Sequence, residues 1–340
     1  MTYRTEHFSH IYVEEEIWDD PLTRQILNHF PHAQMIPVRQ YHDVFSRPKQ
    51  EYAVQKHARN LILARQHGTL LYEGAPVCHS FGHEHFYYTS PALNCLYDCE
   101  YCWLKGMYST ANIVIFINDP REYLEAAAQI SHRFNEEPVF VSFSYETDLF
   151  PLEPLTGFLK RLSHDLPQTG SVTAEVRTKC ASPDLIRSLA RSSQLVLAFT
   201  VSPQEMIDRY EHGTSPLAQR LAAASTALEC GFPVRLCFDP MILFPGWRSA
   251  YAEMLETVRT AVDLSAVTDF SIGSYRQSDQ YQKRMRSRFP DSAVIQYPYE
   301  TDSGYCMYPE RLRKDLENGF RDMLAKYTDP KKIFLLKEEQ

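Results

Sequence analysis

From Phe86 to Tyr275, short apolar runs typical of buried strands alternate with longer amphipathic stretches typical of helices. This alternation indicates parallel strands joined by right-handed crossovers. About six strand–helix units are present, too few for a complete eight-stranded barrel. We therefore predict an α/β fold with a partial (β/α)6 barrel; a doubly wound sheet is the alternative that periodicity does not separate. The predicted strands are 86–89, 139–144, 171–178, 195–201, 234–238 and 268–275, and the predicted helices are 120–134, 152–163, 183–191, 217–230 and 250–264.

The residues before Gly74 are expected to form a small α/β extension. Its predicted elements are a strand at 10–13, a helix at 21–30 with proline in the first turn, a strand at 33–38 and a helix at 53–67. We divide the chain into an N-terminal extension at 1–80, the partial barrel at 81–290 and a C-terminal segment at 291–340 that completes the substrate site.

Bulk composition excludes some classes of protein. Among the 340 residues, no apolar run approaches the length of about 18 residues that a membrane span needs, and the acidic N-terminus lacks the apolar core of a secretory signal. We therefore expect a cytoplasmic location and no membrane partner. Eight cysteines in a reducing compartment need an explanation other than disulfides. A net charge of −8 does not favour nucleic-acid binding, although a local basic patch can still provide it.

Three of the eight cysteines fall within eight residues, directly after the first predicted barrel strand. Cys95, Cys99 and Cys102 have the spacing C-x3-C-x2-C. Thiolates are the usual ligands of iron–sulfur clusters, and three protein ligands leave one iron of a [4Fe–4S] cluster open to chelate a small molecule. A Cys3His zinc site that uses the upstream His83 or His85 is the alternative. The motif and its place after a strand are typical of radical S-adenosylmethionine enzymes.

Beyond the cysteines, the chain resembles the spore photoproduct lyase family of the radical S-adenosylmethionine superfamily. The likeness runs from about His10 to the end of the chain, and its most discriminating part is the glycine–threonine and leucine–alanine run. It rests on Cys99-Glu100-Tyr101-Cys102-Trp103-Leu104, Thr178-Lys179, Phe199-Thr200-Val201-Ser202, Tyr210-Glu211-His212-Gly213-Thr214-Ser215-Pro216, Arg220-Leu221-Ala222-Ala223-Ala224, Gly246-Trp247 and Arg288-Phe289-Pro290.

The resemblance implies a DNA repair lyase with a [4Fe–4S] cluster and S-adenosylmethionine as cofactors. Such an enzyme returns the thymine dimer 5-thyminyl-5,6-dihydrothymine to two thymines. A 5′-deoxyadenosyl radical removes a hydrogen from C6 of the lesion, the linking bond breaks, and a cysteine returns a hydrogen atom. The resemblance also implies an electron donor such as flavodoxin or ferredoxin.

The chain departs from the family pattern at the hydrogen donor. Tyr145-Glu146-Thr147-Asp148 stands where the family has a motif like C-T-S-D. We therefore name Tyr145 and Tyr101 as candidate catalytic residues, and add Cys237, which shares a strand face with Arg235 and Asp239. A small buried hydrophobe is the other interpretation of Cys237. Cys78, Cys180 and Cys230 are interpreted as plain core or surface residues, and Cys306 lies near the C-terminal segment.

Four residues match family positions that contact S-adenosylmethionine. Lys179 is expected to bind the methionyl carboxylate, and Trp103, Thr147 and Thr200 to contact the rest of the cofactor. Local hydrogen bonding, packing or, for Lys179, a solvated strand end is the alternative for each.

A basic run near the C-terminus is the candidate contact with damaged DNA. Five basic side chains within thirteen positions would neutralise phosphates and make binding sensitive to salt, whereas an ordinary solvated helix face is the alternative. The Tyr305–Tyr308 stretch is a candidate wedge for flipping the lesion out of the duplex. The basic residues are Arg276, Lys283, Arg284, Arg286 and Arg288.

Two other functions stay open at this point. The tyrosine at the donor position and the acidic balance favour a radical enzyme of the same family with a different substrate. A non-catalytic zinc or iron–sulfur binding module is the second alternative, and metal analysis would distinguish it.

Overall fold

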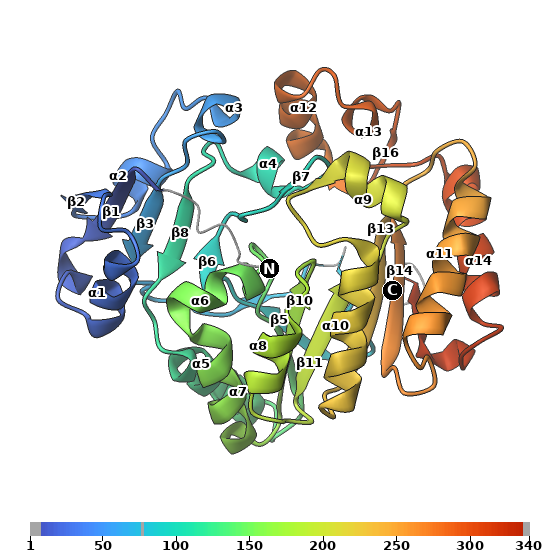
Figure 1. The fold of residues 1–340 in the computed structure, drawn as a ribbon, viewed down its shortest axis with the longest axis horizontal. Coiled ribbons are helices and arrows are strands. Elements are labelled where there is room, and N and C mark those ends of the chain that lie inside the picture. The colour runs from blue at the N-terminus through green and yellow to red at the C-terminus, as the bar shows by residue number, and fades with distance from the viewer. Residues whose placement is uncertain (1–7, 76–77, 336–340) are drawn as a thin grey trace.

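The computed structural model describes residues 8–75 and 78–335, and its larger sheet has eight strands (Figure 1). The strand order is β18-β14-β13-β11-β10-β9-β5-β4. All neighbours from β5 to β18 are parallel, and β4 joins β5 in the antiparallel sense. The strands are β4 (Tyr72–Glu73), β5 (His85–Tyr88), β9 (Val139–Ser142), β10 (Val172–Thr178), β11 (Leu195–Thr200), β13 (Val234–Met241), β14 (Asp269–Ser274) and β18 (Ile333–Leu335).

This order confirms the partial barrel. The strands follow one another across the sheet in chain order, whereas a doubly wound sheet reverses direction at a switch point. The six predicted strands correspond to β5, β9, β10, β11, β13 and β14, and β18 extends the curled sheet beyond them. The helices that follow or precede these strands cover the outer face: α5 (Pro120–Arg133), α7 (Phe158–Asp165), α8 (Pro183–Ser188), α10 (Leu217–Glu229), α11 (Trp247–Ala261) and α14 (Glu310–Leu324).

A second, five-stranded sheet lies beside the barrel in the order β2-β1-β3-β8-β6. Two of its strands, β6 and β8, flank the cysteine segment in the chain, so the two sheets are interleaved between residues 92 and 116. The domain limits at 80 and 290 therefore stay a prediction. The elements of this part are β1 (His10–Glu14), α1 (Pro21–Asn28), β2 (Gln34–Val38), α2 (His42–Phe45), α3 (Tyr52–Gln55), β3 (Leu61–Ala64), β6 (Ala92–Leu93) and β8 (Ile113–Phe116).

Two helix predictions were wrong in their details. The predicted helix at 53–67 is a single turn, α3, followed by the buried strand β3 between β1 and β8. A four-residue apolar run that is covered on both faces has no period to distinguish strand from helix. The predicted helix at 152–163 is broken at Gly157, whose backbone φ of +58° ends α6 (Glu153–Thr156) before α7 begins.

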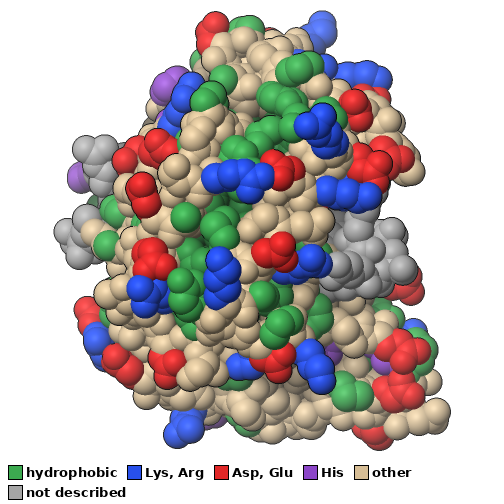
Figure 2. All heavy atoms as spheres, turned by 90° about the vertical axis from the view of Figure 1, so that its right-hand side faces the viewer, with side chains coloured by type: hydrophobic (Ala, Val, Ile, Leu, Met, Phe, Trp, Pro, Cys, Tyr) green, Lys and Arg blue, Asp and Glu red, His purple; other side chains and the backbone are tan. Residues whose placement is uncertain are grey.

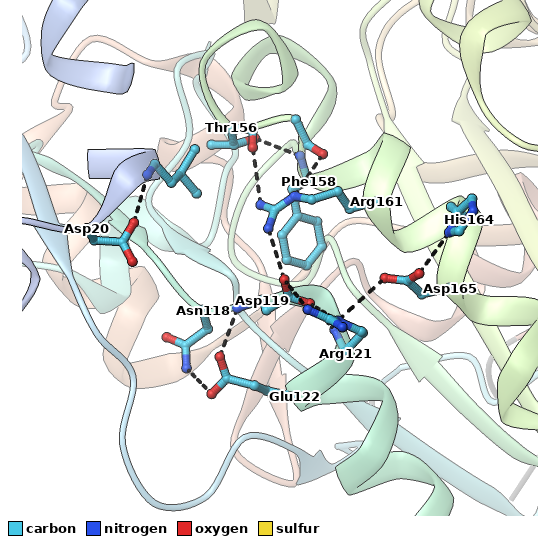
Figure 3. Close-up of polar contacts among 12 residues, drawn as sticks. Asp20, Asn118, Asp119, Arg121, Glu122, Thr156, Phe158, Arg161, His164 and Asp165 are labelled. Atoms are coloured by element: carbon cyan, nitrogen blue, oxygen red, sulfur yellow. Dashed lines mark hydrogen bonds and ion pairs between the residues drawn. The ribbon is translucent and has the colours of Figure 1, made fainter. Parts of the chain in front are cut away.

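Polar contacts at the start of α5 join it to α7 (Figure 3). Asp119 caps the helix and forms a capping box with Glu122. Arg161 of α7 donates to Asp119 Oδ2 at 3.3 Å and to the Thr156 carbonyl at 3.2 Å. These contacts fix the two helices that cover β9 and β10 against each other.

Arg235 forms the central ion pairs in the interior of the barrel. Its buried guanidinium donates to the carboxylates of Glu175 and Asp269, which come from the strands β10 and β14. Its plane also lies over Phe81, with the guanidinium carbon 3.1 Å from the ring centroid. A buried charge is stable only when it is paired and hydrogen-bonded, as Arg235 is here. Arg235 therefore points into the barrel, as we predicted for this face of β13.

The C-terminal part of the chain packs against the segment that follows the cysteines. Arg288 donates to the Lys105 and Tyr108 carbonyls at 2.5 and 2.7 Å, and Arg284 donates to the Gly106 carbonyl at 3.2 Å. These bonds clamp α12 to α4. The elements here are α4 (Leu104–Met107), β15 (Arg276–Ser278), α12 (Asp279–Arg288), α13 (Ala293–Gln296), β16 (Glu300–Asp302) and β17 (Tyr305–Met307).

The face over α11 and α14 carries both signs of charge (Figure 2). Ion pairs link neighbours on it, including Arg248 with Asp315, Arg259 with Glu256 and Lys314 with Glu310. Because basic and acidic side chains are mixed on this face, they do not form a single basic patch. In the part of the chain that the structure describes, no helix has the length and apolar character to cross a bilayer.

The α4–α12 contact gives a test of the fold. A Cβ at Gly106 would lie 2.8 Å from the backbone of Tyr281 and closer still to its Cβ. We expect Gly106→Ala to lower the free energy of unfolding by about 1–3 kcal/mol, the usual cost of overpacking, as measured by urea denaturation.

Gly319→Ala is the matched control, because Gly319 is also helical but faces the end of the flexible Arg248 side chain at 3.2 Å. Alanine there should be neutral or stabilising, since it favours the helix. Equal stability of Gly106→Ala and the unaltered protein would contradict the close approach of the two helices.

Candidate active site

A cavity of about 580 Å³ opens at the carboxyl ends of the barrel strands. Tyr88, Ser142, Thr178 and Thr200 line it, and each is the last residue of its strand: β5, β9, β10 and β11. Loops that follow parallel strands converge at this end of a barrel, which is where barrel enzymes place their active sites. The chain after β14 closes the cavity with residues from Tyr275 to Tyr305, most of them in β15 and α12.

The three motif cysteines lie together on this cavity. Cys95, Cys99 and Cys102 all line it, on the loop that follows β5. Arg59 of the N-terminal part donates to the carbonyls of Cys95 and Leu96 at 3.4 and 2.7 Å. The short strand β7 (Asp98–Cys99) pairs with β12 (Glu211–His212), which holds the middle of the loop against the barrel.

The surroundings of the thiols fit an iron–sulfur cluster. Burial raises the pKa of Cys95 to about 12 and raises the pKa of Cys99 and of Cys102, so the thiolates need a bound cation to replace the protons. Backbone N–H groups of Tyr97 and Asp148 point at Cys95 and lower its pKa. Peptide donors of this kind stabilise ligated sulfur.

The arrangement does not fit the zinc alternative. Within residues 8–75 and 78–335, no three His, Cys, Asp or Glu side chains are close enough to share a single metal ion. His85 instead bonds to Glu137 at 2.7 Å, and His83 stacks on Phe140 with ring centroids 4.6 Å apart. The upstream histidines are therefore occupied elsewhere.

Lys179 and Tyr101 lie beside Cys99. The Lys179 ammonium is 5.6 Å from the centroid of the Tyr101 ring, and both residues line the cavity. Tyr101 donates to Glu211, which also accepts from the fully buried Arg220 at 2.5 Å. Burial alone lowers the pKa of Lys179, but the neighbouring Cys99 and Glu211 raise it overall. A cation therefore faces the cavity next to the cysteines.

Asp148 joins the ends of β9 and β10 under this site. Its carboxylate accepts from the Lys179 backbone at 2.8 Å and from the Thr178 hydroxyl at 2.8 and 2.9 Å. Burial raises the pKa of Asp148 to about 6, against these hydrogen bonds, which lower it. The other expected cofactor residues, Trp103, Thr147 and Thr200, also line the cavity. The buried Thr147 hydroxyl has no hydrogen-bond partner among the described residues, which suits a ligand in the cavity.

A thiol contacts the tyrosine at the donor position. Cys78 Sγ lies 3.4 Å from the Tyr145 hydroxyl, and both residues line the cavity. Trp103 lies next to them, with its ring centroid 5.3 Å from that of Tyr145. Cys237 is fully buried and does not line the cavity. The structure thus brings Tyr145 and Cys78 together and leaves Cys237 apart.

The five basic residues of the predicted DNA patch do not form one surface. Arg276 lies in the cavity and binds Asp239 through two bonds of 2.8 and 3.0 Å. Arg286 donates to the Tyr297 carbonyl at 2.8 Å, and Arg288 belongs to the α4 clamp. Lys283, which pairs with Asp279, and Arg284 are the two with exposed side chains.

Sequence reasoning missed the roles of four residues of this site. Three of them lie within stretches that correspond to family motifs: Glu211, Arg220 and Asp148. A motif match does not show which side chains they contact, so it assigned them no role. Cys78 lies in a segment without regular structure, where no periodicity indicates which way a side chain points. Its only signal was a spare cysteine shortly before the first barrel strand.

Comparison with known proteins agrees with this geometry. The family model described as spore photoproduct lyase matches residues 7–297. The chain is 24% identical to spore photoproduct lyase of Bacillus subtilis (strain 168) over 70% of this chain and 71% of the relative. It is 23% identical to the enzyme of Geobacillus sp. (strain Y412MC61), over 69% of this chain and 72% of the relative.

Solved structures show the same fold. A spore photoproduct lyase in which one cysteine is replaced by serine superimposes with a TM-score of 0.82 at 17% identity, covering 97% of this chain and 98% of the other. A doubly substituted spore photoproduct lyase with bound AdoMet and dinucleoside spore photoproduct gives the same score and coverage at 19% identity. The matched family model spans most of the chain and includes the cysteine loop, the barrel strands from β5 to β14 and all residues that line the cavity except Tyr305. The chain belongs to the spore photoproduct lyase family.

Proposed function

We propose that this protein is a radical S-adenosylmethionine lyase that repairs 5-thyminyl-5,6-dihydrothymine in DNA. The observation that carries the proposal is a single cavity with Cys95, Cys99 and Cys102 at one end and the Cys78–Tyr145 pair beside them. The three cysteines would bind the cluster that starts a radical reaction. The Cys78–Tyr145 pair beside them can end the reaction by returning a hydrogen atom.

We assign the binding of the cofactors to residues around the cysteine loop. Cys95, Cys99 and Cys102 would hold a [4Fe–4S] cluster, which supplies the electron that converts S-adenosylmethionine into a hydrogen-abstracting radical. Lys179 would bind the methionyl carboxylate, since it lines the cavity and its ammonium lowers the pKa of Cys99 against the effect of burial. Thr147, Thr200 and Trp103 would contact the rest of the molecule.

We assign the return of the hydrogen atom to Cys78, with Tyr145 as its partner. A thiol that lines the cavity can reach a substrate radical, and the Tyr145 hydroxyl at 3.4 Å can exchange a hydrogen atom with the sulfur. Burial raises the pKa of Cys78, so the group stays a neutral thiol, which is the form that donates a hydrogen atom. Cys237 is less suited, because it does not reach the cavity. We assign Tyr101, which lines the cavity beside Lys179, a supporting role in the radical reaction near the cluster.

Damaged DNA and an electron donor such as flavodoxin or ferredoxin are the proposed partners. We assign phosphate contacts to Lys283 and Arg284, because both are exposed on α12, two and three positions after the cavity-lining Tyr281. Arg284 would do so beside its bond to the Gly106 carbonyl. Arg276 would act inside the cavity instead. A cytoplasmic location is consistent with the eight cysteines, all of which are free thiols in the structure.

A different substrate in the same family is the second candidate. It is favoured by Tyr145, which stands where the resemblance places the donor cysteine, and by the charged pair Arg276–Asp239 on the cavity wall. A charged pair on the wall suits a substrate with polar or charged groups better than a neutral pyrimidine lesion.

The substrate is tested by anaerobic incubation of cluster-loaded protein with the synthetic dinucleoside lesion, S-adenosylmethionine and reductant. We expect thymidine and 5′-deoxyadenosine to form together. Formation of 5′-deoxyadenosine without thymidine would reject this lesion in favour of the second candidate, and formation of neither would reject both.

The metal site is tested by removing one ligand. Cys102→Ala should lose the brown colour and bound iron of the reconstituted protein and should not cleave S-adenosylmethionine. Cys230→Ala is the matched control, because Cys230 caps α10 away from the cavity. Full iron content in Cys102→Ala would contradict the assignment.

The hydrogen donor is tested by isotope transfer. In D₂O, an exchanged thiol should deliver deuterium to the methyl group of one product thymine. We expect Cys78→Ala to abolish this transfer and lower the thymidine yield, whereas Cys237→Ala should leave both unchanged. Unaltered deuterium transfer in Cys78→Ala would remove Cys78 from the mechanism.

A further inference from the structure

A row of aromatic rings leads from the cavity to the protein surface. The rings of Tyr145 and Tyr88 are stacked with centroids 4.0 Å apart and an interplanar angle of 25°. Tyr88 stacks in turn on Tyr72, at 5.6 Å and 28°. Tyr72 does not line the cavity, and 43% of it is exposed. Three oxidisable rings therefore connect the reactive end of the cavity with solvent.

The backbone fixes this row. Tyr72 and Tyr88 are directly opposed partners in the antiparallel pair β4–β5, and opposed residues on one sheet face bring their side chains into contact. Tyr88 also pairs with Ser142, the last residue of β9, and Tyr145 follows three residues later. The stack is thus set by strand register rather than by mobile surface side chains.

The inner end of the row contacts groups that could carry an unpaired electron. The Tyr145 hydroxyl touches Cys78 Sγ at 3.4 Å, and its ring lies 5.3 Å from that of Trp103, the neighbour of Cys102. Thiol S–H and phenol O–H bonds are similar in strength, so a hydrogen atom moves between Cys78 and Tyr145 with little change in energy. An unpaired electron on the sulfur therefore becomes available to the ring of Tyr145.

Glu146 places a carboxyl group beside the stack, and burial raises its pKa. This buried residue accepts a hydrogen bond from Tyr108 at 2.6 Å. The pKa values of Tyr145 and Tyr88 are both raised, mainly by burial and to a lesser extent by Glu146. A carboxylate near a ring favours removal of an electron from it. In its ionised form, Glu146 would therefore favour transient oxidation of these tyrosines, whereas burial opposes loss of their protons.

We propose that Tyr145, Tyr88 and Tyr72 form a radical-exit path that carries an unpaired electron from the active site to the surface. The inference rests on the proposed radical function. In each step the outer tyrosine loses one electron and its hydroxyl proton, and the inner phenoxyl radical gains one of each and becomes tyrosine again. At the surface, a small one-electron reductant such as ascorbate gives an electron and a proton to Tyr72. An unpaired electron left on Cys78, after the thiol has given its hydrogen atom to a carbon radical, is thereby removed without damage to the cavity.

The path is tested by freeze-quench electron paramagnetic resonance. Cluster-loaded protein is reduced, freed of excess reductant and mixed with S-adenosylmethionine, with and without the dinucleoside lesion; ascorbate is then added. We expect a phenoxyl signal, identified with ring-deuterated tyrosine, that decays several-fold more slowly in Tyr72→Phe and in Tyr88→Phe. Phenylalanine keeps each ring in place, so a merely structural role would not change the decay.

Tyr327→Phe is the matched control, since Tyr327 is also 43% exposed but lies outside the stack. Its decay rate should equal that of the unaltered protein. Equal decay in all variants, or no phenoxyl signal in any of them, would overturn the path. Thymidine and 5′-deoxyadenosine are measured in the same samples, and the mixture without lesion still tests the path if lesion repair itself fails.

Discussion

The structure depends on holding three thiols at one end of a single cavity. Burial opposes their ionisation, so the site is stable as a thiolate set only with a cation among the sulfurs. Peptide groups prepare it: the N–H groups of Tyr97 and Asp148 point at Cys95, and that of Leu104 points at Cys102. Asp148 in turn binds the end of β10, so the same residue orients a sulfur and fixes the position of Lys179.

The sequential order of the barrel strands brings the remaining groups to this end. β5 supplies Tyr88, the segment after β9 supplies Tyr145 and Thr147, and β11 ends in Thr200. The C-terminal segment closes the cavity from the other side and is tied to the cysteine loop by Arg288 and its neighbours on α12. Substrate and cofactor regions are therefore parts of one rigid wall, which suits chemistry that must keep a reactive radical away from solvent.

Much of this could be predicted from sequence, for reasons that differ from element to element. The barrel strands were predictable because buried strands and amphipathic helices alternate regularly, and the cysteine loop because ligand spacing is local. β3 was misassigned because four buried apolar residues have no period. β8 (Ile113–Phe116) was missed because it leaves the barrel series and joins the other sheet.

The contacts that depend on partners far apart in the chain were out of reach of sequence patterns. A run of arginines on α12 looks like a nucleic-acid patch until Arg286 and Arg288 are seen to bond backbone carbonyls. The pairing of Cys78 with Tyr145 joins residues 67 positions apart through a segment without regular structure. In both cases the charge or thiol is visible in the sequence, but its partner is decided by the fold.

The central claim is that the three cysteines bind a cluster whose fourth iron is open to S-adenosylmethionine. The most direct measurement is electron–nuclear double resonance of the reduced, reconstituted protein with S-adenosylmethionine labelled with ¹⁵N at its amino group. We predict a hyperfine coupling between the labelled nitrogen and the cluster. A four-iron centre whose spectrum is unchanged by the labelled compound, or protein that holds no such centre, would contradict the account.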